Sequence, residues 1–217
     1  KNIEYIGNLK LTSSNKNINK IDNYNNNFQI ITIMLASTHF NEEELIFPVL
    51  KKIIKDFDNV RIIIAPRHPE RSEQIKTLCT KYTLKSKLES DKKINNGEIL
   101  IINSFGILHK YFEISDIVFL GGSLVSAGGH NPIEPALNNC AIVTGPQLFN
   151  WENIFDDMHN SKSCLKISST EDLLKALIEL LTNKDKIIDM KKNAYNFAKK
   201  QFVDTKNLDK TIIRHLC

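Results

Sequence analysis

The sequence is poor in the features that mark metal, redox and membrane proteins. Only four of its 217 residues are cysteine, and no two of them have the spacing of a metal site or a redox pair. We therefore expect reduced thiols, as in a cytosolic protein. No apolar run is long enough to span a bilayer, and no signal peptide is recognisable.

The charge pattern is equally restrained. The formal net charge is +4 and the isoelectric point is near 8.8, which suits an anionic ligand or an anionic membrane surface. No basic block alternates with aromatic residues, so we expect no nucleic-acid binding. There is no paired-aspartate motif, no His/Cys cluster and no nucleophile beside a base, so we expect no metal and no cofactor. Helix N-termini and fixed donors would then stabilise a leaving phosphate.

The chain divides into four predicted segments. Because it begins at Lys1 and not at Met, we expect it to be a fragment of a longer protein. Residues 1–12 are predicted to form an interdomain segment, and residues 13–27, dominated by Asn and Lys, a loose loop. Residues 28–203 should form one domain, followed by a C-terminal helix over 204–217.

Within that domain, short apolar runs alternate with helical patterns. The runs predict strands at 30–36, 60–65, 99–102, 117–120, 141–144 and 164–167. Helices are predicted at 41–57 with Asn41 as N-cap, 69–82, 107–112, from 132, from 151, at 170–182 and at 184–202. This alternation predicts an α/β fold, a doubly wound parallel sheet of the Rossmann-like kind.

Polar residues stand directly after the predicted strands. In a doubly wound sheet, ligands bind outside the carboxyl ends of the strands, so these residues should share one rim. They are Ser37, Thr38 and His39; Arg67 and His68; Asn103, Ser104, Phe105 and Gly106; Gly121, Gly122 and Ser123; and Gly145 with Pro146.

The most distinctive segment follows the predicted strand at 117–120. Two glycine pairs, at 121–122 and 128–129, precede His130 and a helix start at Asn131 and Pro132. Glycines let the backbone approach a ligand, and a helix start attracts anions, so the segment predicts a phosphate site. The alternative is purely structural: the glycines are turns, and Glu134 completes a capping box with Asn131.

Other rim residues also allow two interpretations. Arg67 could stack on a base or pair with a phosphate, or could be a surface side chain paired with Glu70 or Glu73. The three acids at 42–44 suit the first turn of a helix. Because acids would repel a phosphate, we expect at most one of them to point inward.

Several blocks together resemble one family. They are Gly121-Gly122-Ser123-Leu124-Val125, Gly128-Gly129-His130-Asn131-Pro132, Glu134-Pro135, Ala36-Ser37-Thr38-His39 with Glu42-Glu43, Pro66-Arg67-His68-Pro69-Glu70-Arg71, Gly7-Asn8-Leu9-Lys10, and Gly145-Pro146 followed by Asn150. In this order they resemble the signature of 3-deoxy-D-manno-octulosonic acid (Kdo) transferases. The match covers most of the chain from Gly7 to Asn150.

The resemblance implies the C-terminal, donor-binding half of a two-domain GT-B glycosyltransferase. Such enzymes move Kdo from CMP-Kdo to a lipid A precursor, with inversion and without a metal, in lipopolysaccharide biosynthesis at the cytoplasmic face of the Gram-negative inner membrane. The general base belongs to the N-terminal half, so we expect no catalytic residue here, and a soluble, inactive fragment. The donor-binding residues that the resemblance implies are Ser37, Thr38, His39, Arg67, His68, Phe105, Gly106, Gly122, Ser123, Gly128, Gly129, His130, Asn131, Glu134 and Asn150.

The chain also departs from the family pattern. The run Asn103-Ser104-Phe105-Gly106-Ile107 lacks the acids that the family usually has at both ends of this segment, although Phe105 and Gly106 could still pack on a base. Ser126 stands where the family commonly has proline. Two other functions remain open: a UDP-sugar-dependent transferase or epimerase of the same fold, and a nucleotide-binding module without catalysis.

Overall fold

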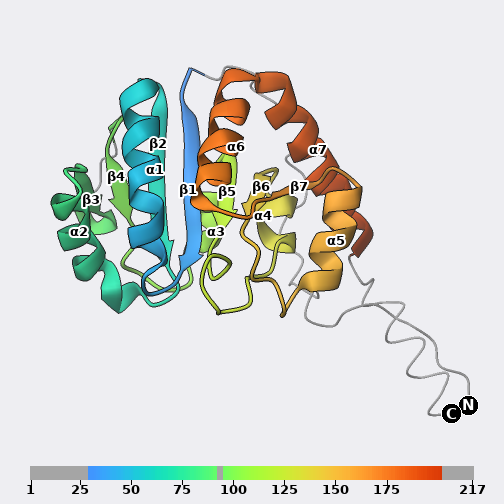
Figure 1. Cartoon of the computed structure of the whole chain (residues 1–217), viewed down its shortest axis with the longest axis horizontal. Helices are drawn as coiled ribbons and strands as arrows, with labels where there is room; N and C mark the ends of the chain where they lie inside the picture. The colour runs from blue at the N-terminus through green and yellow to red at the C-terminus, as the bar shows by residue number, and fades with distance from the viewer. Residues whose placement is uncertain (1–28, 92–94, 202–217) are drawn as a thin grey trace, which may run out of the picture.

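The computed structural model describes residues 29–91 and 95–201, which form a parallel seven-stranded sheet with helices on both faces (Figure 1). The strand order is β3-β4-β2-β1-β5-β6-β7, and every neighbouring pair is parallel. The strands are β1 (Ile31–Thr38), β2 (Val60–Pro66), β3 (Ser86–Leu88), β4 (Ile99–Ile101), β5 (Ile117–Leu120), β6 (Ala141–Thr144) and β7 (Cys164–Lys166). The predicted doubly wound α/β fold is confirmed.

The helices follow the predicted alternation, with ends shifted by a few residues. They are α1 (Glu42–Asp56), α2 (Ser72–Lys81), α3 (Leu108–Phe112), α4 (Ile133–Leu137), α5 (Glu152–Asn160), α6 (Thr170–Thr182) and α7 (Lys184–Gln201), with short 3₁₀ turns η2 (Pro69–Arg71) and η3 (Glu89–Asp91). The segments predicted at 1–12, 13–27 and 204–217 lie outside the described residues.

Burial on both faces explains why the central strands are mostly apolar. In β1, Ile33 and Leu35 pack with side chains of α1, α2 and α6, whereas Met34 and Ala36 pack on the opposite face with those of α3, α4 and α5. A strand of a parallel sheet that is covered on both faces has no polar side, and its sequence does not alternate. Helix α7 contributes to both clusters.

Two sequence predictions need correction here. The edge strand β3 was not expected, because it has only three residues, Ser-Lys-Leu, and no apolar run. Asn41 stands at the N-cap of α1, but its side chain makes no capping hydrogen bond. Its backbone is left-handed, with φ at 67°, whereas a capping side chain reaches the first turn from an extended backbone.

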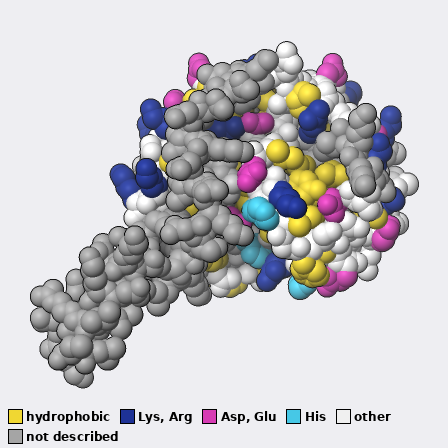
Figure 2. Space-filling view, turned by 180° about the vertical axis from the view of Figure 1, so that it is seen from behind, with side chains coloured by type: hydrophobic (Ala, Val, Ile, Leu, Met, Phe, Trp, Pro, Cys, Tyr) yellow, Lys and Arg dark blue, Asp and Glu magenta, His cyan; other side chains and the backbone are white. Residues whose placement is uncertain are grey.

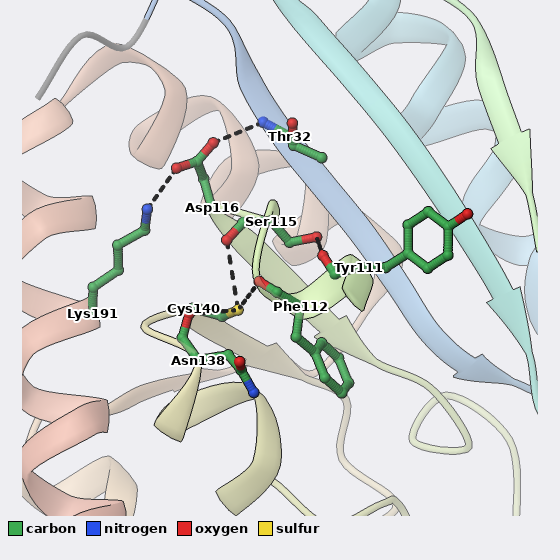
Figure 3. Close-up of polar contacts among 8 residues, drawn as sticks. All are labelled: Thr32, Tyr111, Phe112, Ser115, Asp116, Asn138, Cys140 and Lys191. Atoms are coloured by element: carbon green, nitrogen blue, oxygen red, sulfur yellow. Dashed lines mark hydrogen bonds and ion pairs between the residues drawn. The ribbon is translucent and has the colours of Figure 1, made fainter. Parts of the chain in front are cut away.

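An acidic side chain fastens the amino ends of the central strands (Figure 3). The N–H of Asp116 donates to the carbonyl of Thr32 at 2.8 Å, and the N–H of Thr32 donates to Asp116 Oδ2 at 2.9 Å. Lys191 of α7 donates to the other carboxylate oxygen at 2.5 Å. The pair therefore ties α7 to β1 and to the start of β5, at the end of the sheet opposite the candidate site.

The three described cysteines are buried and form no disulfide. Burial raises the thiol pKa of Cys79 to about 11 and that of Cys164 to about 12. The Cys140 thiol donates to the carbonyl of Phe112 at 3.3 Å (Figure 3). Such thiols are poor nucleophiles at neutral pH, so their role in this fold is packing.

The chain reverses direction across the sheet between β1 and β5. From β1 it moves to β2 on one side, and β5 pairs with β1 on the other. The loops that follow the carboxyl ends of the strands gather at the lower edge of the sheet in Figure 1. Ligands of doubly wound sheets bind at such a switch point, so we sought the functional site there.

Candidate functional site

A buried glutamate joins the two loops at the switch point. Glu42 is fully buried at the start of α1. Its Oε2 accepts from the N–H groups of His39 at 3.1 Å and Gly122 at 2.7 Å. Its Oε1 accepts from those of Ser123 and Leu124, both at 3.0 Å. One carboxylate thus fixes the loop after β1 to the loop after β5.

This arrangement changes the role that the sequence predicts for Gly122 and Ser123. Their N–H groups point at Glu42, so they cannot donate to a bound phosphate. The Ser123 hydroxyl is buried as well: it donates to the Leu120 carbonyl at 2.6 Å and accepts from the Gly145 N–H at 2.8 Å. Gly122 and Ser123 therefore support the site structurally, as part of the loop after β5, and do not donate to the ligand.

A second buried acid stands beside the first. Glu43 accepts from the Thr38 hydroxyl at 2.7 Å and from both terminal nitrogens of Arg71, at 3.1 and 2.8 Å. The prediction that at most one acid points inward is therefore wrong. The repulsion that it assumed is absent, because each buried carboxylate has donors inside the protein. The Thr38 hydroxyl donates to Glu43 and the residue is itself buried, so Thr38 has no donor left for a ligand.

Arg67 extends from the end of β2 into solvent. Its N–H donates to the Thr38 carbonyl at 2.9 Å, which fixes the backbone. Within the described ranges its guanidinium forms no ion pair with Glu70 or Glu73; instead His68 Nδ1 lies 3.5 Å from Glu70 Oε1. The structural alternative for Arg67 thus lacks its partner, and the guanidinium is available to a ligand.

Two histidines meet directly above the switch point. The Nε2 atoms of His39 and His130 lie 2.9 Å apart, and the rings stack with centroids 5.1 Å apart. Burial lowers the pKa of His130 to about 4, and it lowers that of His39 despite the opposing charge of Glu42. One ring donates and the other accepts in this contact. Because burial lowers both pKa values below the ordinary value of a histidine, both rings are mainly neutral at pH 7. The positive charge of Arg67 lowers both pKa values as well.

Local backbone geometry holds this pair. Ser37 has a left-handed backbone, with φ at 58°, at the bulge where the register of β1 against β2 shifts. Its backbone forms a hydrogen bond with His130 that raises the histidine pKa, although less than burial lowers it. A Cβ on Gly122, whose φ is 65°, would lie 3.1 Å from His39 Cδ2 and 3.2 Å from His130 Nε2.

The second glycine pair makes room for another segment of this chain. A Cβ on Gly128 would lie 2.3 Å from Asn150 Nδ2, and one on Gly129 would lie 2.9 Å from Leu148 Cδ2. Asn150 donates from Nδ2 to the Ala127 carbonyl at 3.0 Å and from its backbone to Gly128 at 3.2 Å. Asn150 therefore braces the loop, and the glycines permit that contact.

The helix start behind His130 is capped, but not by a capping box. Asn131 Oδ1 accepts from the N–H of Ile133 at 3.0 Å, and α4 begins at Ile133, one residue after the predicted start at Pro132. In the described residues Glu134 makes no side-chain hydrogen bond. It is exposed, yet partial burial raises its carboxyl pKa, opposed by the charge of His109. Glu134 thus presents an unpaired carboxylate beside the site.

Beyond β2, the loop after β4 carries an exposed aromatic ring. The Phe105 residue is 72% exposed, and Gly106, with φ at 75°, has no atom within 4 Å of where a Cβ would stand. The Ser104 hydroxyl donates to Glu89 Oε2 at 2.9 Å. The sequence analysis did not single out Glu89, because it did not predict strand β3, which directly precedes this residue. It also did not predict that Glu42 binds the loop after β5.

Residues 29–91 and 95–201 contain neither a metal-binding cluster nor a membrane-spanning helix. No three His, Cys, Asp or Glu side chains are placed to hold a metal ion. No helix in these ranges is both long and apolar enough to cross a membrane.

Comparison with known proteins points in one direction. A curated 3-deoxy-D-manno-octulosonic acid transferase of Haemophilus influenzae is 35% identical over 150 residues, covering 68% of this chain and 35% of the relative. One of Rickettsia bellii is 32% identical over 209 residues, covering 92% of this chain and 49% of the relative. The chain spans less than half the length of the curated relatives that it matches most fully. No protein-family model matches it.

Solved structures give the same picture. The C-terminal CMP-Kdo binding domain of WaaA from Acinetobacter baumannii is similar with a TM-score of 0.73 and 26% identity, covering 78% of this chain and 89% of that one. WaaG, a glycosyltransferase involved in lipopolysaccharide biosynthesis, has a TM-score of 0.61 at 13% identity, covering 81% of this chain and 44% of that one, and shows the fold alone. The fold is that of the C-terminal domain of GT-B glycosyltransferases.

Proposed function

We propose that this chain, which belongs to the family of the Kdo transferases, is the domain of such an enzyme that binds the donor CMP-Kdo. The observation that carries the proposal is the likeness to a CMP-Kdo binding domain over 89% of that domain's length. Arg67, which has no ion pair within the described ranges, and the His39–His130 pair at the switch point add a site of the right chemistry.

The rim offers a different group to each part of a nucleotide. Arg67 is a permanent cation with a planar set of donors, and such groups bind phosphate well. In the neutral pair beside it, one ring proton lies between the two Nε2 atoms and the other in the hydrogen bond to the Ser37 backbone, so the pair donates to a phosphate oxygen once the phosphate charge has drawn a further proton onto it. Glu134, whose carboxylate is unpaired in the described part of the chain, can accept hydrogen bonds from ribose hydroxyls. We therefore assign the phosphate to Arg67, His39 and His130, and the ribose to Glu134.

For the whole protein we propose an inverting, metal-independent transfer of Kdo to a lipid A precursor at the cytoplasmic face of the inner membrane. The general base then lies outside this chain. The family implies this position of the base. The buried acids Glu42 and Glu43 do not compete for the role, because donors of the protein itself fully engage their carboxylates. We expect no product when this chain is incubated with CMP-Kdo and a lipid A precursor. Turnover by the chain alone would place the base within it.

Calorimetric titration of the chain with CMP and with UMP tests the donor assignment. We expect CMP to bind more tightly. UMP binding as tight or tighter would overturn the CMP-Kdo assignment and favour a UDP-sugar enzyme. The structural likeness to a UDP-N-acetylglucosamine 2-epimerase, at 16% identity, shows a shared fold and does not support that function.

Removal of one hydroxyl tests the role of Glu134. If its carboxylate holds the ribose, 2′-deoxy-CMP binds more weakly than CMP, and Glu134→Gln weakens CMP because charge-assisted hydrogen bonds are the stronger kind. The deoxy penalty should then shrink in the variant. If CMP and its deoxy form bind alike to the unmodified chain, Glu134 has no part in ribose binding.

A further inference from the structure

A carboxylate from the edge strand stands over the loop that follows β4. Strands β3 and β4 are parallel neighbours in which Leu88 lies opposite Ile101, so the residues after them reach the same rim. Glu89 comes directly after β3, and the Ser104 hydroxyl fixes its Oε2 at 2.9 Å. The loop itself, residues 103–107, contains no acid. The carboxylate beside the loop after β4 therefore comes from Glu89, the residue that follows β3.

A second hydroxyl faces the same carboxylate. The phenol pKa of Tyr111, on α3, is raised to about 12, first by burial and then by the nearby charge of Glu89. An ionised carboxylate offers about four acceptor positions. The Ser104 hydroxyl occupies one of them, so Glu89 is held in place and can still accept from a ligand.

An aromatic ring lies next to this acceptor along the chain. Phe105 directly follows Ser104 and is the most exposed of the large apolar residues in the described ranges. Open space surrounds Gly106, the next residue. Figure 2 shows the opposite side of the molecule from Figure 1, where histidine, acidic and basic side chains lie beside exposed apolar ones. Nucleobases stack on exposed aromatic rings, whatever their sequence.

The distance from the phosphate site fits one nucleotide. Along the rim, β2 separates β4 from β1, and neighbouring strands lie about 4.8 Å apart, so the loop after β4 is roughly 10 Å from the histidine pair. Helix α3, into which this loop leads, packs against α4, which carries Glu134, so the ribose site borders the same loop. A nucleotide with its phosphate at His39 and its ribose at Glu134 would extend its base to Phe105.

We propose that Phe105 and Glu89 form a base-recognition platform, in which the ring stacks on the base and the carboxylate selects a base with an exocyclic amino group. This inference rests on the proposed function and deepens it. Cytosine presents an N4 amino donor where uracil presents an O4 acceptor. A carboxylate accepts from the first and repels the second. Glu89 is thus the residue that makes the site prefer CMP to UMP.

The test is a calorimetric comparison of CMP and UMP on the full 217-residue chain and three variants. Glu89→Gln keeps an acceptor for Ser104 but adds an amide donor that suits uracil. We expect CMP affinity to fall about tenfold or more and UMP affinity to hold or rise, so that the preference collapses. Phe105→Ala should weaken both nucleotides by a similar factor. Glu113→Gln, an exposed acid at the end of α3, is the matched control and should change neither.

The outcomes separate this inference from the proposed function. Circular dichroism of each variant first confirms that it is folded. If Glu89→Gln retains the CMP preference of the unmodified chain, the role of Glu89 is refuted while donor binding stands. If Phe105→Ala leaves both affinities unchanged, the stacking surface is refuted. If the unmodified chain binds neither nucleotide, the proposed function fails and the platform with it.

Discussion

Replacing Glu42 by glutamine removes two of the four hydrogen bonds by which its carboxylate joins the loop after β1 to the loop after β5. Its Oε1 accepts from Ser123 and Leu124, and its Oε2 accepts from His39 and Gly122. A glutamine has nearly the same shape and keeps one oxygen, which can still accept two of the four bonds. Its NH₂ group then faces two backbone donors and can accept from neither.

The size of the effect follows from those two orphaned donors. A buried N–H without a partner costs about 1–3 kcal/mol, so Glu42→Gln should lower the free energy of unfolding by about 2–6 kcal/mol. For a domain of this size, the melting temperature should fall by roughly 4–24 °C. Urea unfolding followed by circular dichroism measures the first quantity, and a thermal scan measures the second.

The neighbouring acid Glu44 provides the control. It pairs at the surface with Lys81, with 3.1 Å between Oε1 and Nζ, and Glu44→Gln should leave the unfolding curve nearly unchanged. CMP affinity should fall in Glu42→Gln, because Glu42 positions the backbone of His39. If the two variants unfold at the same urea concentration, the carboxylate does not hold the loops together and our account of the rim is wrong.

Three other changes test separate parts of the structure. Arg67→Ala should weaken CMP binding by about 1.5–3 kcal/mol in calorimetry while leaving thermal stability unchanged, because the side chain has no ion pair in the described residues; unchanged affinity would remove Arg67 from the site. Because the pKa of His130 is about 4 when folded and near 6.5 when unfolded, the unfolded chain binds more protons between these values, so stability should fall as pH is lowered from about 6.5 to about 4. His130→Asn should flatten that dependence in urea titrations, and an equally steep curve would contradict the assignment. Lys191→Met leaves the Asp116 carboxylate, 19% exposed, without its cation and should cost about 1–3 kcal/mol of unfolding free energy, whereas Lys175→Met, which breaks an exposed pair, should cost almost nothing; equal losses would refute the clamp.

The strands were predictable because burial leaves a direct mark on the sequence. The run at 117–120 is apolar throughout and that at 141–144 is apolar up to its last residue, Thr144, and the structure places β5 and β6 at those residues. Strand β3 has no such mark, because an edge strand of three residues needs little apolar surface. The placement of Arg67 and His39 on one rim was also predictable, since it follows from the carboxyl-end rule alone.

The roles of the acids were not predictable in the same way. An acid in the first turn of a helix has the same local sequence signature whether it faces water or folds back onto another loop. Three of the four N–H groups that bind Glu42 are 80 to 82 residues away, and the sequence around Glu42 does not identify them. One signal was present: Gly121 leaves the space into which the carboxylate fits, since a Cβ on it would lie 2.9 Å from Glu42 Oε2.

The buried acids also explain how a rim with three neighbouring glutamates can serve an anion. Glu42 is satisfied by four N–H groups and Glu43 by Arg71 and a hydroxyl, so neither presents a bare charge to the ligand. The His39–His130 pair is neutral at pH 7, and Arg67 is therefore the cation at the switch point that has no acid against it in the described residues. A phosphate there meets one guanidinium that no described acid compensates, which makes its binding depend on Arg67 more than on the basic charge of the whole chain.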